Sequence, residues 1–411
     1  MKIAVIGSGI AGLSAAYYLS KKHKVDLFEK ENHFGGHSYT IDIKISDKVI
    51  PVDIGFIVFN HTTYPNLINF FKENKINIEK SNMSFSVKVK NSNIEYCGKG
   101  LKGIFSNKLN LFNLKFIKMF IEIINFYNKS NNLRTIDDKV TLGEYLKIQK
   151  LSNYFKNYHI IPMVAAIWSM PPYEAEQMPL KFFIKFFQNH GLFKIKNRPQ
   201  WYTVTNRSKS YVNKILKKIS GEHYKNYAIK KIIRNSNNIK VYYGDKTEFF
   251  VYDKVILATH ADEALNLIEE PLNDEKEILS NFKYKKNLAY IHFDESVMPI
   301  NRKAWCSWNS SVDEKNDKNS VTYWLNLLQN LKVEKNIFLT LNPFFKIDEK
   351  KIYKVIEFTH PYYDQKALDN QYKLKSIQNK KNILFCGSYF GYGFHEDGIK
   401  SSIEMIKYLN D

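Results

Sequence analysis

The amino-terminal stretch "KIAVIGSGIAGLSAAYYLSKKHKVDLFEK" constrains the fold more than any other part of the chain. The run "KIAVIG" is β-branched and apolar without polar alternation, which is typical of a buried parallel strand. Gly7, Gly9 and Gly12 follow it at the start of a helical pattern, and "KVDLFEK" indicates a second strand. Strand, glycine-rich turn, helix and strand in this order form a βαβ unit. We therefore predict an α/β chain that begins with a Rossmann-like nucleotide-binding domain.

The three glycines have separate roles in such a turn. The first permits the tight turn, the second lets the backbone approach a pyrophosphate, and the third lets helix and strand pack closely. The helix amino terminus offers free N–H groups and a positive dipole to the phosphates. Glu29 ends the second strand, 17 residues after Gly12, where its carboxylate can accept both ribose hydroxyls of an adenosine. NAD and FAD share this half-site, so the pattern alone leaves both open.

Three later segments favour FAD. The Gly35-Gly36 pair lies soon after Glu29 and supplies a second backbone approach to the pyrophosphate and ribityl chain. The segment "DKVILATHA" at 253–261 indicates an apolar strand that enters a turn of small residues. Near the carboxyl terminus, a strand is followed by Gly387 and by a helix that begins near Gly398. This second helix amino terminus suits the N1–O2 edge of a flavin, where negative charge develops on reduction.

The chain is too long for one ordinary compact core, so two domains are expected. Helical spacing dominates from about 65 to 210, whereas strand-like runs return at 226–259. We predict a discontinuous FAD-binding domain and a substrate or cap domain, and an exposed loop at "SVDEKNDKNS" (311–320). The FAD-binding domain comprises 1–64, 200–262 and 380–411, and the cap domain comprises 65–199 and 263–379.

The formal net charge is +20, from 61 basic and 41 acidic residues. Lys, Asn and Ile are used heavily along the whole chain, so diffuse compositional charge is the first interpretation. A surface that faces an anionic membrane or a fatty acid is the second. No nucleic-acid-binding motif is present, and we expect no nucleic-acid partner. The longest apolar stretch, 109–127, is interrupted by Lys115, Lys118 and Glu122, which argues against a bilayer span.

The three cysteines, Cys97, Cys306 and Cys386, are far apart and form no CxxC pair. They fit a reducing cytoplasm better than a disulfide scaffold or a zinc site, and no metal site is expected. The chain starts on a strand-like run without a charged segment and cleavage site, so we expect no signal peptide. The expected location is the cytoplasm, with peripheral contact with the inner face of the membrane. Hydrolase, zinc-protease and NTPase motifs are absent from the sequence.

Longer strings resemble one enzyme superfamily. "GSGIAGLSAAYYL", "VDLFEKENHFGGH", "ILATHADEA" and "CGSYFGYGFHEDGIKSS" resemble the flavin amine oxidase and phytoene desaturase superfamily. "VDIGFIVFNHTTYPNL", "RPQWYTV", "AWCSWN" and "EFTHPYYD" resemble, more narrowly, a bacterial group of predicted NAD/FAD-binding proteins. That group is similar to the amino-terminal domain of plant cyclopropane fatty acid synthases. The resemblance covers nearly the whole chain and implies a glutathione-reductase-like two-dinucleotide fold with a mixed sheet and a helical cap.

The resemblance implies FAD that is bound non-covalently by both ends of the chain. At two places the chain departs from the superfamily pattern: Gly-Gly-Arg is replaced by Gly35-Gly36-His37, and a later Gly-Gly is replaced by Asn206-Arg207. Both departures weaken the transfer of amine-oxidase details. By motif match the cofactor contacts are assigned to Gly7, Gly9, Ile10, Ala11, Gly12, Glu29, Lys30, Gly36, His37, Ile229, Thr259, Gly387, Glu396, Gly398 and Ile399.

The catalytic candidates are His395 and Glu396 in "GFHEDG". A histidine can move a proton near neutral pH, and Glu396 could act as a base or bond to the ribityl chain. The alternative is that Glu396 and Asp397 cap the last helix. Trp168 and Met170 could line an acyl channel or lie in an ordinary core, and His292 is interpreted as structural.

The resulting hypothesis is a cytoplasmic FAD-dependent oxidoreductase that acts on an apolar substrate. A fatty-acyl chain of a lipid is the substrate class that the resemblance suggests. The reaction would desaturate, reduce or isomerise a carbon–carbon bond by hydride exchange with flavin N5. The alternatives are a flavin amine oxidase and a non-catalytic flavoprotein partner of a lipid-modifying methyltransferase. The oligomeric state stays open.

Overall fold

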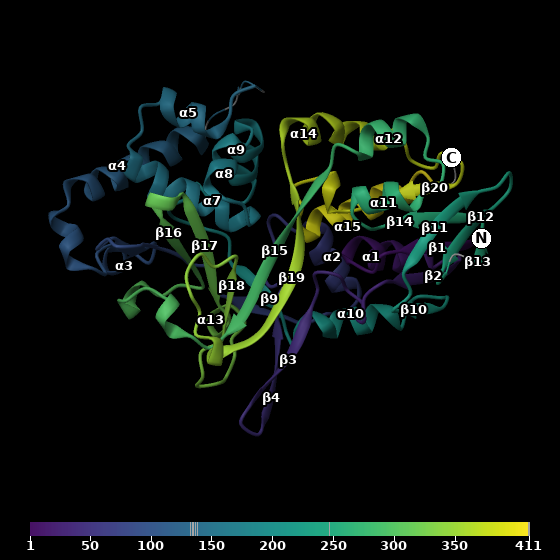
Figure 1. Ribbon diagram of the computed structural model, residues 1–411, viewed down its shortest axis with the longest axis horizontal. Helices are drawn as coiled ribbons and strands as arrows, with labels where there is room; N and C mark the ends of the chain where they lie inside the picture. Colours follow the sequence, from purple (N-terminus) through teal and green to yellow (C-terminus); the bar gives the residue numbers. More distant parts are fainter. Residues whose placement is uncertain (132, 134, 136, 138, 246, 410–411) are drawn as a thin grey trace. The chain divides into compact units, whose positions relative to one another are not determined.

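The computed structural model describes residues 1–131, 133, 135, 137, 139–245 and 247–409. Residues 132, 134, 136, 138, 246, 410 and 411 belong to the predicted domains but lie outside the described residues. The chain divides into two compact units (Figure 1). Unit 1 comprises Met1–Glu79, Thr203–Lys283 and Gln365–Asp411, and unit 2 comprises Lys80–Tyr202 and Tyr284–Asp364.

Unit 1 is built on a five-stranded sheet in which neighbouring strands run parallel. Its strand order is β10-β2-β1-β14-β20, so the chain winds outward from β1 in both directions. In such a sheet the ligand crevice lies outside the carboxyl ends of the strands, where the winding reverses between β1 and β14. This topology confirms the predicted Rossmann-like α/β fold. The strands are β1 (Lys2–Ile6), β2 (Lys24–Glu29), β10 (His223–Lys225), β14 (Lys254–Leu257) and β20 (Ile383–Phe385).

Helix α1 (Ile10–Leu19) packs against α15 (His395–Ile406), and α15 also packs against α2 (Pro65–Glu73). Small residues allow the α1–α15 approach. A Cβ at Gly398 would lie 2.8 Å from Cγ2 of Ile10. The hydroxyls of Ser14 and Ser402, both fully buried, are 2.7 Å apart and hydrogen-bonded. Helices α1 and α15, from opposite ends of the chain, are thus in direct contact.

The rest of unit 1 consists of a hairpin, a small antiparallel sheet and four more helices. Its sheet order is β11-β12-β13. The hairpin pairs β3 with β4, and α10 packs against α1. The elements are β3 (Thr40–Ile45), β4 (Lys48–Asp53), β5 (Phe59–Asn60), α10 (Ser208–Leu216), β11 (Ile229–Arg234), β12 (Ile239–Tyr243), β13 (Glu248–Tyr252), α11 (Ala261–Leu267), α12 (Asn273–Leu279) and α14 (Gln365–Gln371).

Unit 1 extends beyond the boundaries predicted for the FAD-binding domain. It also contains 65–79, 263–283 and 365–379, which the sequence analysis assigned to the cap domain. The reason is packing: α2 lies against α15, and α12 lies against α11 and the turn that follows α14. The helical periodicity of these segments gave no sign of which unit each helix would join.

Unit 2 contains a seven-stranded mixed sheet with the order β19-β15-β18-β17-β16-β7-β8. The strands β16 and β7 run parallel, whereas β16 and β17 are antiparallel. The strands are β7 (Phe85–Val89), β8 (Glu95–Cys97), β15 (Lys283–His292), β16 (Trp308–Asp313), β17 (Lys318–Trp324), β18 (Phe338–Leu341) and β19 (Ile352–Tyr362). The segment 311–320 is therefore the tip of a hairpin: the turn at 314–317 is exposed, as predicted, but both ends of the segment belong to strands.

Helices form the other part of unit 2. They are α3 (Leu101–Ile104), α4 (Leu114–Asn131), α5 (Leu142–Ile148), α6 (Asn153–Phe155), α7 (Ile161–Trp168), α8 (Pro172–Gln177), α9 (Leu180–Asn189) and α13 (Leu325–Leu328). The strands β6 (Ile78–Ser81) and β9 (Trp201–Val204) carry the chain across the unit boundaries. Trp168 is buried against Phe182 and Phe186, which favours the core interpretation of this residue. His292 is fully buried and hydrogen-bonded to Thr340, as expected of a structural histidine.

Candidate functional site

The glycine turn after β1 contains two glycines that packing requires and one that it does not. Gly7 has φ +97°, and a Cβ there would lie 2.7 Å from the Ala258 carbonyl oxygen. A Cβ at Gly12 would lie 1.8 Å from the Gly7 carbonyl oxygen. A Cβ at Gly9 would meet nothing within 4 Å. Gly9 is the N-cap of α1, and no side chain caps this helix. Open space therefore adjoins a helix amino terminus, which favours anions.

The second glycine pair lies against the first turn. Gly35 donates its N–H to Ser8 Oγ at 3.0 Å, and a Cβ at Gly36 would lie 3.0 Å from Gly9 Cα. Gly35 and Gly36 have φ +117° and +56°, in the left-handed region that glycine adopts without strain. The structure thus brings together the two glycine motifs that the sequence analysis assigned to one site.

Glu29 is buried at the end of β2, and its carboxylate already has protein partners. Its Oε2 accepts the N–H and the hydroxyl of Ser8, at 3.1 and 2.5 Å, and its Oε1 accepts the Glu31 N–H at 3.0 Å. A carboxylate has about four acceptor positions, so one is left. Accepting both ribose hydroxyls, as predicted, therefore requires the Ser8 hydroxyl to turn away. Ser8 was missed, although it stands between Gly7 and Gly9.

Two predicted contact residues flank this edge of the sheet. Ile229 begins β11 and is buried, and nearby the Tyr227 N–H donates to the Glu29 carbonyl oxygen at 2.8 Å. Thr259 follows β14, and its Cγ2 would lie 3.3 Å from a Cβ at Gly7. Both residues therefore lie beside the glycine turn or the end of β2, and their contact with a cofactor stays a prediction.

Two other predicted cofactor contacts, Lys30 and His37, interact with protein groups. Lys30 forms an ion pair with Glu263, with 2.6 Å between Nζ and Oε1, so its charge is directed to α11. The His37 carbonyl oxygen accepts the Phe56 N–H at 2.7 Å. A Cβ at Gly55 would lie 2.3 Å from the same oxygen. These contacts fix the backbone of the 35–37 turn.

The carboxy-terminal motif residues lie at the amino-terminal end of α15. Ile399 is fully buried in its first turns, one residue after Gly398, which contacts Ile10. A Cβ at Gly387 would lie 2.4 Å from the Tyr389 ring. The start of α15 is therefore brought beside the start of α1 by close backbone packing.

His395 is the first residue of α15, and its ring stacks on Phe56 with 3.6 Å between centroids. Its Nε2 lies 2.9 Å from Ser38 Oγ, which is also hydrogen-bonded to the Tyr211 hydroxyl. Burial lowers the pKa of His395 to about 3, so the imidazole is neutral at pH 7. This environment does not favour the predicted role as a proton carrier near neutral pH. The Ser38–Tyr211 contact could not be found from sequence spacing.

Glu396 and Asp397 cap two different helices. Glu396 accepts the Asn66 side-chain and backbone N–H groups at 2.6 and 3.1 Å and the Leu67 N–H at 3.0 Å, so it caps α2. Asp397 accepts the Phe394 N–H at 2.9 Å and caps α15 itself. Burial raises the pKa of Asp397 to about 7. The predicted capping of the last helix thus describes Asp397 alone.

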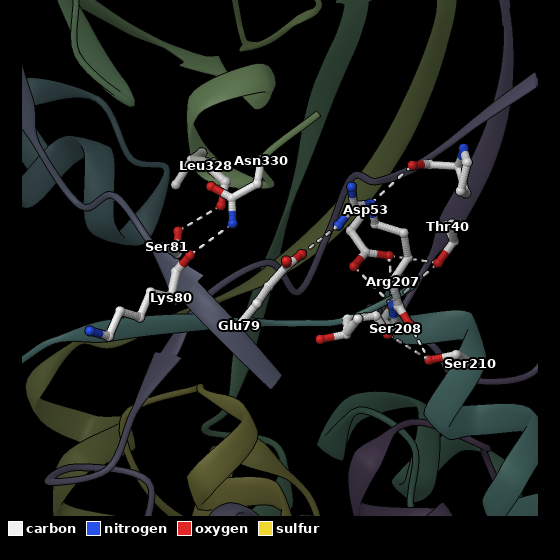
Figure 2. A network of polar contacts seen from close by, with 12 residues as sticks. Thr40, Asp53, Glu79, Lys80, Ser81, Arg207, Ser208, Ser210, Leu328 and Asn330 are labelled. Carbon is white, nitrogen blue, oxygen red and sulfur yellow. Dashed lines mark hydrogen bonds and ion pairs between the residues drawn. The ribbon is translucent and has the colours of Figure 1, made fainter. Parts of the chain in front are cut away.

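A polar cluster at the start of α10 joins the β3–β4 hairpin (Figure 2). Asp53 is buried and accepts the Thr40 hydroxyl at 2.6 Å and the Ser208 hydroxyl and N–H at 2.7 and 2.9 Å. Burial raises the pKa of Asp53 to about 6, although these hydrogen bonds and nearby Arg207 oppose the rise. At a pH of about 6, half of the Asp53 carboxyl groups are thus protonated.

Asn206 and Arg207 occupy the positions where the resembled superfamily carries Gly-Gly. Their φ angles are 61° and 72°, and Arg207 has ψ 167°. This last region belongs almost exclusively to glycine and costs about 1–3 kcal/mol for other residues. Arg207 Nε donates to the Pro51 carbonyl oxygen at 3.0 Å, and Nη1 lies 3.6 Å from Glu79 Oε1. Both residues thus have backbone angles that glycine adopts without strain, and the Arg207 contacts offset the strain at this position.

Comparisons with known proteins support the fold. The family described as NAD(P)-binding Rossmann-like domain matches residues 5–73. A fatty acid isomerase from P. acnes that produces CLA has a similar structure, with a TM-score of 0.68, 14% identity, and coverage of 98% of this chain and 97% of that chain. A putrescine oxidase structure with bound putrescine has a TM-score of 0.69 and 12% identity, and both chains are covered completely.

Cyclohexylamine oxidase from Brevibacterium oxydans IH-35A has a TM-score of 0.67 and 13% identity, with 100% of this chain and 99% of that chain covered. A search of curated protein sequences finds no match. The chain therefore has the α/β fold of these proteins along its entire length.

The strain at position 207 can be tested by comparing two substitutions. Both R207A and R207G lose the contacts to Pro51 and Glu79, but only glycine relieves the backbone strain. We expect R207G to be more stable than R207A by about 1–2 kcal/mol. The measurement is urea unfolding. At exposed Lys209 within α10 the order should be reversed, with K209A more stable than K209G by about 1 kcal/mol. Equal stabilities at 207 would contradict the strain.

The raised pKa of Asp53 predicts a pH-dependent stability. The folded state binds the proton more tightly than the unfolded state, whose pKa is near 3.8, so this contribution is present at low pH. This contribution to the free energy of unfolding, about 3 kcal/mol in total, is lost as the pH rises through about 6. The D53N variant does not titrate there. The stability of the natural protein relative to D53N should therefore fall between pH 4 and pH 7.5, and a constant difference would contradict the assignment.

Proposed function

We propose that unit 1 binds FAD non-covalently and that the protein is an FAD-dependent oxidoreductase. The open space at Gly9 carries this proposal. Packing explains glycine at positions 7 and 12 but not at position 9, where a side chain would meet no protein atom within 4 Å. The phosphates of a dinucleotide at the amino terminus of α1 give the missing reason for glycine.

Each motif residue then has a role toward the cofactor. The first N–H groups of α1, from Ile10 to Gly12, bind the pyrophosphate, and Glu29 accepts a ribose hydroxyl. The Ile229 backbone binds the adenine. The ribityl chain and the flavin are held by residues of the other turns: Gly36, His37, Thr259, Gly387, Gly398 and Ile399. Bound FAD supplies a centre that accepts or gives a hydride.

His395 and Glu396 are positioning residues in this proposal, in place of the catalytic roles first expected. The neutral His395 ring is fixed between Phe56 and Ser38, and Glu396 is engaged by the amino terminus of α2. Their contacts hold the first turn of α15 in place. The turn is then ready to meet a ligand without rearranging, which lowers the cost of binding.

The favoured substrate class is apolar, with a fatty-acyl chain as the leading candidate. The reaction is desaturation, reduction or isomerisation of a carbon–carbon bond. Support comes from the sequence resemblance to proteins linked with modified fatty acids and from the likeness to the P. acnes fatty acid isomerase. The link to cyclopropane fatty acid synthases rests on the sequence strings alone, as does the alternative of a non-catalytic flavoprotein partner of a methyltransferase.

Amine oxidation is the second candidate, and the similar solved structures support it as much as they support a lipid substrate. The putrescine and cyclohexylamine oxidases have similar structures over the whole chain. The net charge of +20 works against the encounter with polycations such as putrescine, although it says little about a local site. The two functions differ in what reduces the flavin, so one experiment separates them.

The glycine turn gives a matched pair of variants for the cofactor claim. G9A places a methyl group where the phosphates are expected, in open space and at φ −60°, so stability should change by less than about 1 kcal/mol. Flavin binding should weaken at least tenfold. G12A places its methyl group against the Gly7 carbonyl and should lower stability itself. The measurements are flavin absorbance after titration with FAD, and urea unfolding.

Two results would contradict the proposal at this point. One is a natural protein that stays colourless after reconstitution with FAD. The other is a stable G9A variant that binds FAD as well as the natural protein.

The substrate is tested under anaerobic conditions with the flavin-loaded protein, once with the flavin oxidised and once with the flavin reduced by dithionite, because saturation of a double bond takes a hydride from reduced flavin. A fatty-acyl phospholipid, putrescine and cyclohexylamine are added separately, and the flavin absorbance is followed. Lipid recovered from the mixture is examined by mass spectrometry for gained, lost or shifted double bonds. Bleaching by either amine with no change in the lipid would overturn the lipid assignment. Flavin that no compound reduces, with unchanged lipid, would favour the non-catalytic alternative.

A further inference from the structure

One segment of unit 2 combines strong basicity with exposed apolar side chains. Residues 98–121, called here the basic–apolar segment, contain five lysines and no aspartate or glutamate. The segment includes α3, a short 3-10 helix at Lys108–Phe112 and the first turns of α4 (Figure 1). Its second half belongs to the apolar stretch 109–127, which charged residues interrupt. In the folded chain this segment exposes apolar side chains beside its lysines.

Large apolar side chains of this segment point into solvent. Phe112 is 85% exposed, Leu114 is 80% exposed and Leu101 is 74% exposed. Ile300, 88% exposed, lies near this segment, because the neighbouring Asn301 side chain donates a hydrogen bond to the Ser106 carbonyl oxygen. We call this surface the apolar patch, and it consists of Leu101, Leu109, Leu111, Phe112, Leu114 and Ile300. Clustered exposure of this kind marks an interaction site.

The patch is displayed by an ordered scaffold. Phe116 and Met119, on the inner side of α4, are fully buried, and the Phe116 ring packs on Tyr96. The buried Asn110 side chain donates to the Glu95 carbonyl oxygen at 3.2 Å. The segment therefore already has its own core contacts, and the exposed side chains are in excess of what folding uses.

The surrounding charge identifies the partner. Lys102, Lys108 and Lys115 are exposed, and no ion pair joins them to an acid among the described residues. We propose that the basic–apolar segment docks on an anionic lipid surface, with the apolar patch inserted among the acyl chains and the lysines at the headgroups. Apolar insertion and lysine–headgroup attraction together give stable attachment, which neither gives alone.

The attachment is peripheral. Among the described residues, none of the helices has the length and hydropathy of a transmembrane segment. Lysine side chains suit this depth, because their alkyl stems cover apolar surface while the ammonium groups stay in water. The proposal does not depend on flavin chemistry, although a protein held at a lipid surface would meet acyl substrates there.

Co-sedimentation of the full chain with vesicles tests the proposal. The protein should pellet with vesicles of phosphatidylcholine containing one third phosphatidylglycerol, and much less with pure phosphatidylcholine. The triple variant K102Q/K108Q/K115Q should bind the anionic vesicles about a hundredfold more weakly, from about fivefold for each lysine. The variant F112S/L114S should bind at least tenfold more weakly.

Matched controls use exposed residues elsewhere. Ile148 in α5 is 65% exposed, and the neighbouring Lys147 is also exposed, so I148S and K147Q should bind as the natural protein does. In an F112W variant, the added tryptophan should be quenched by brominated acyl chains. All the changed side chains are exposed, so the variants should unfold at the same urea concentration as the natural protein.

Three outcomes would overturn the proposal. The first is no binding to anionic vesicles at low salt. The second is F112S/L114S binding as strongly as I148S. The third is a self-associated natural protein, seen by sedimentation velocity, that F112S/L114S converts to monomers without any loss of lipid binding; the patch would then join two copies of this chain.

Discussion

The site in unit 1 depends on a backbone contact at the start of α1. Gly12 packs so closely on the Gly7 carbonyl that no side chain fits between them, and Gly398 allows α15 to approach the same turn. Through these contacts the amino termini of two helices from opposite ends of the chain lie side by side. The cofactor site that we propose is therefore incomplete until the last strand and helix have joined the first βαβ unit. Local folding of the amino-terminal segment cannot produce it.

Much of this architecture could be predicted from the sequence, because glycine spacing and strand periodicity are local signals. The returning carboxy-terminal strand and helix were predicted for the same reason. The partners of individual side chains could not be predicted. Glu396 caps α2 through Asn66, a residue 330 positions away, and no local pattern encodes that pairing. The strand ends within 311–320 were also missed, because the polar composition of this segment hides two strands. These strands pair with each other and place Asp313 opposite Lys318.

Asn206 and Arg207 have backbone angles typical of glycine, although neither residue is a glycine. The sequence alone presents this pair as a departure from Gly-Gly, yet both residues have positive φ. Strain at Arg207 is balanced by its contacts with Pro51 and Glu79, beside the buried Asp53 cluster. At this position, side-chain interactions hold a backbone conformation that glycine would adopt without them. Such substitutions are recognisable only when backbone angles are known.

The Ser8–Glu29 contact has a consequence for how a ligand is gained and lost. The Ser8 hydroxyl donates to the Glu29 carboxylate and accepts the Gly35 N–H, so this corner of the fold is satisfied before any ribose arrives. A first incoming hydroxyl takes the one acceptor position that is left on the carboxylate. A second hydroxyl exchanges one hydrogen bond for another, and an exchange of this kind gains little free energy. The protein's own hydrogen bonds thus fix the shape of this corner, and its folding does not require a ligand there.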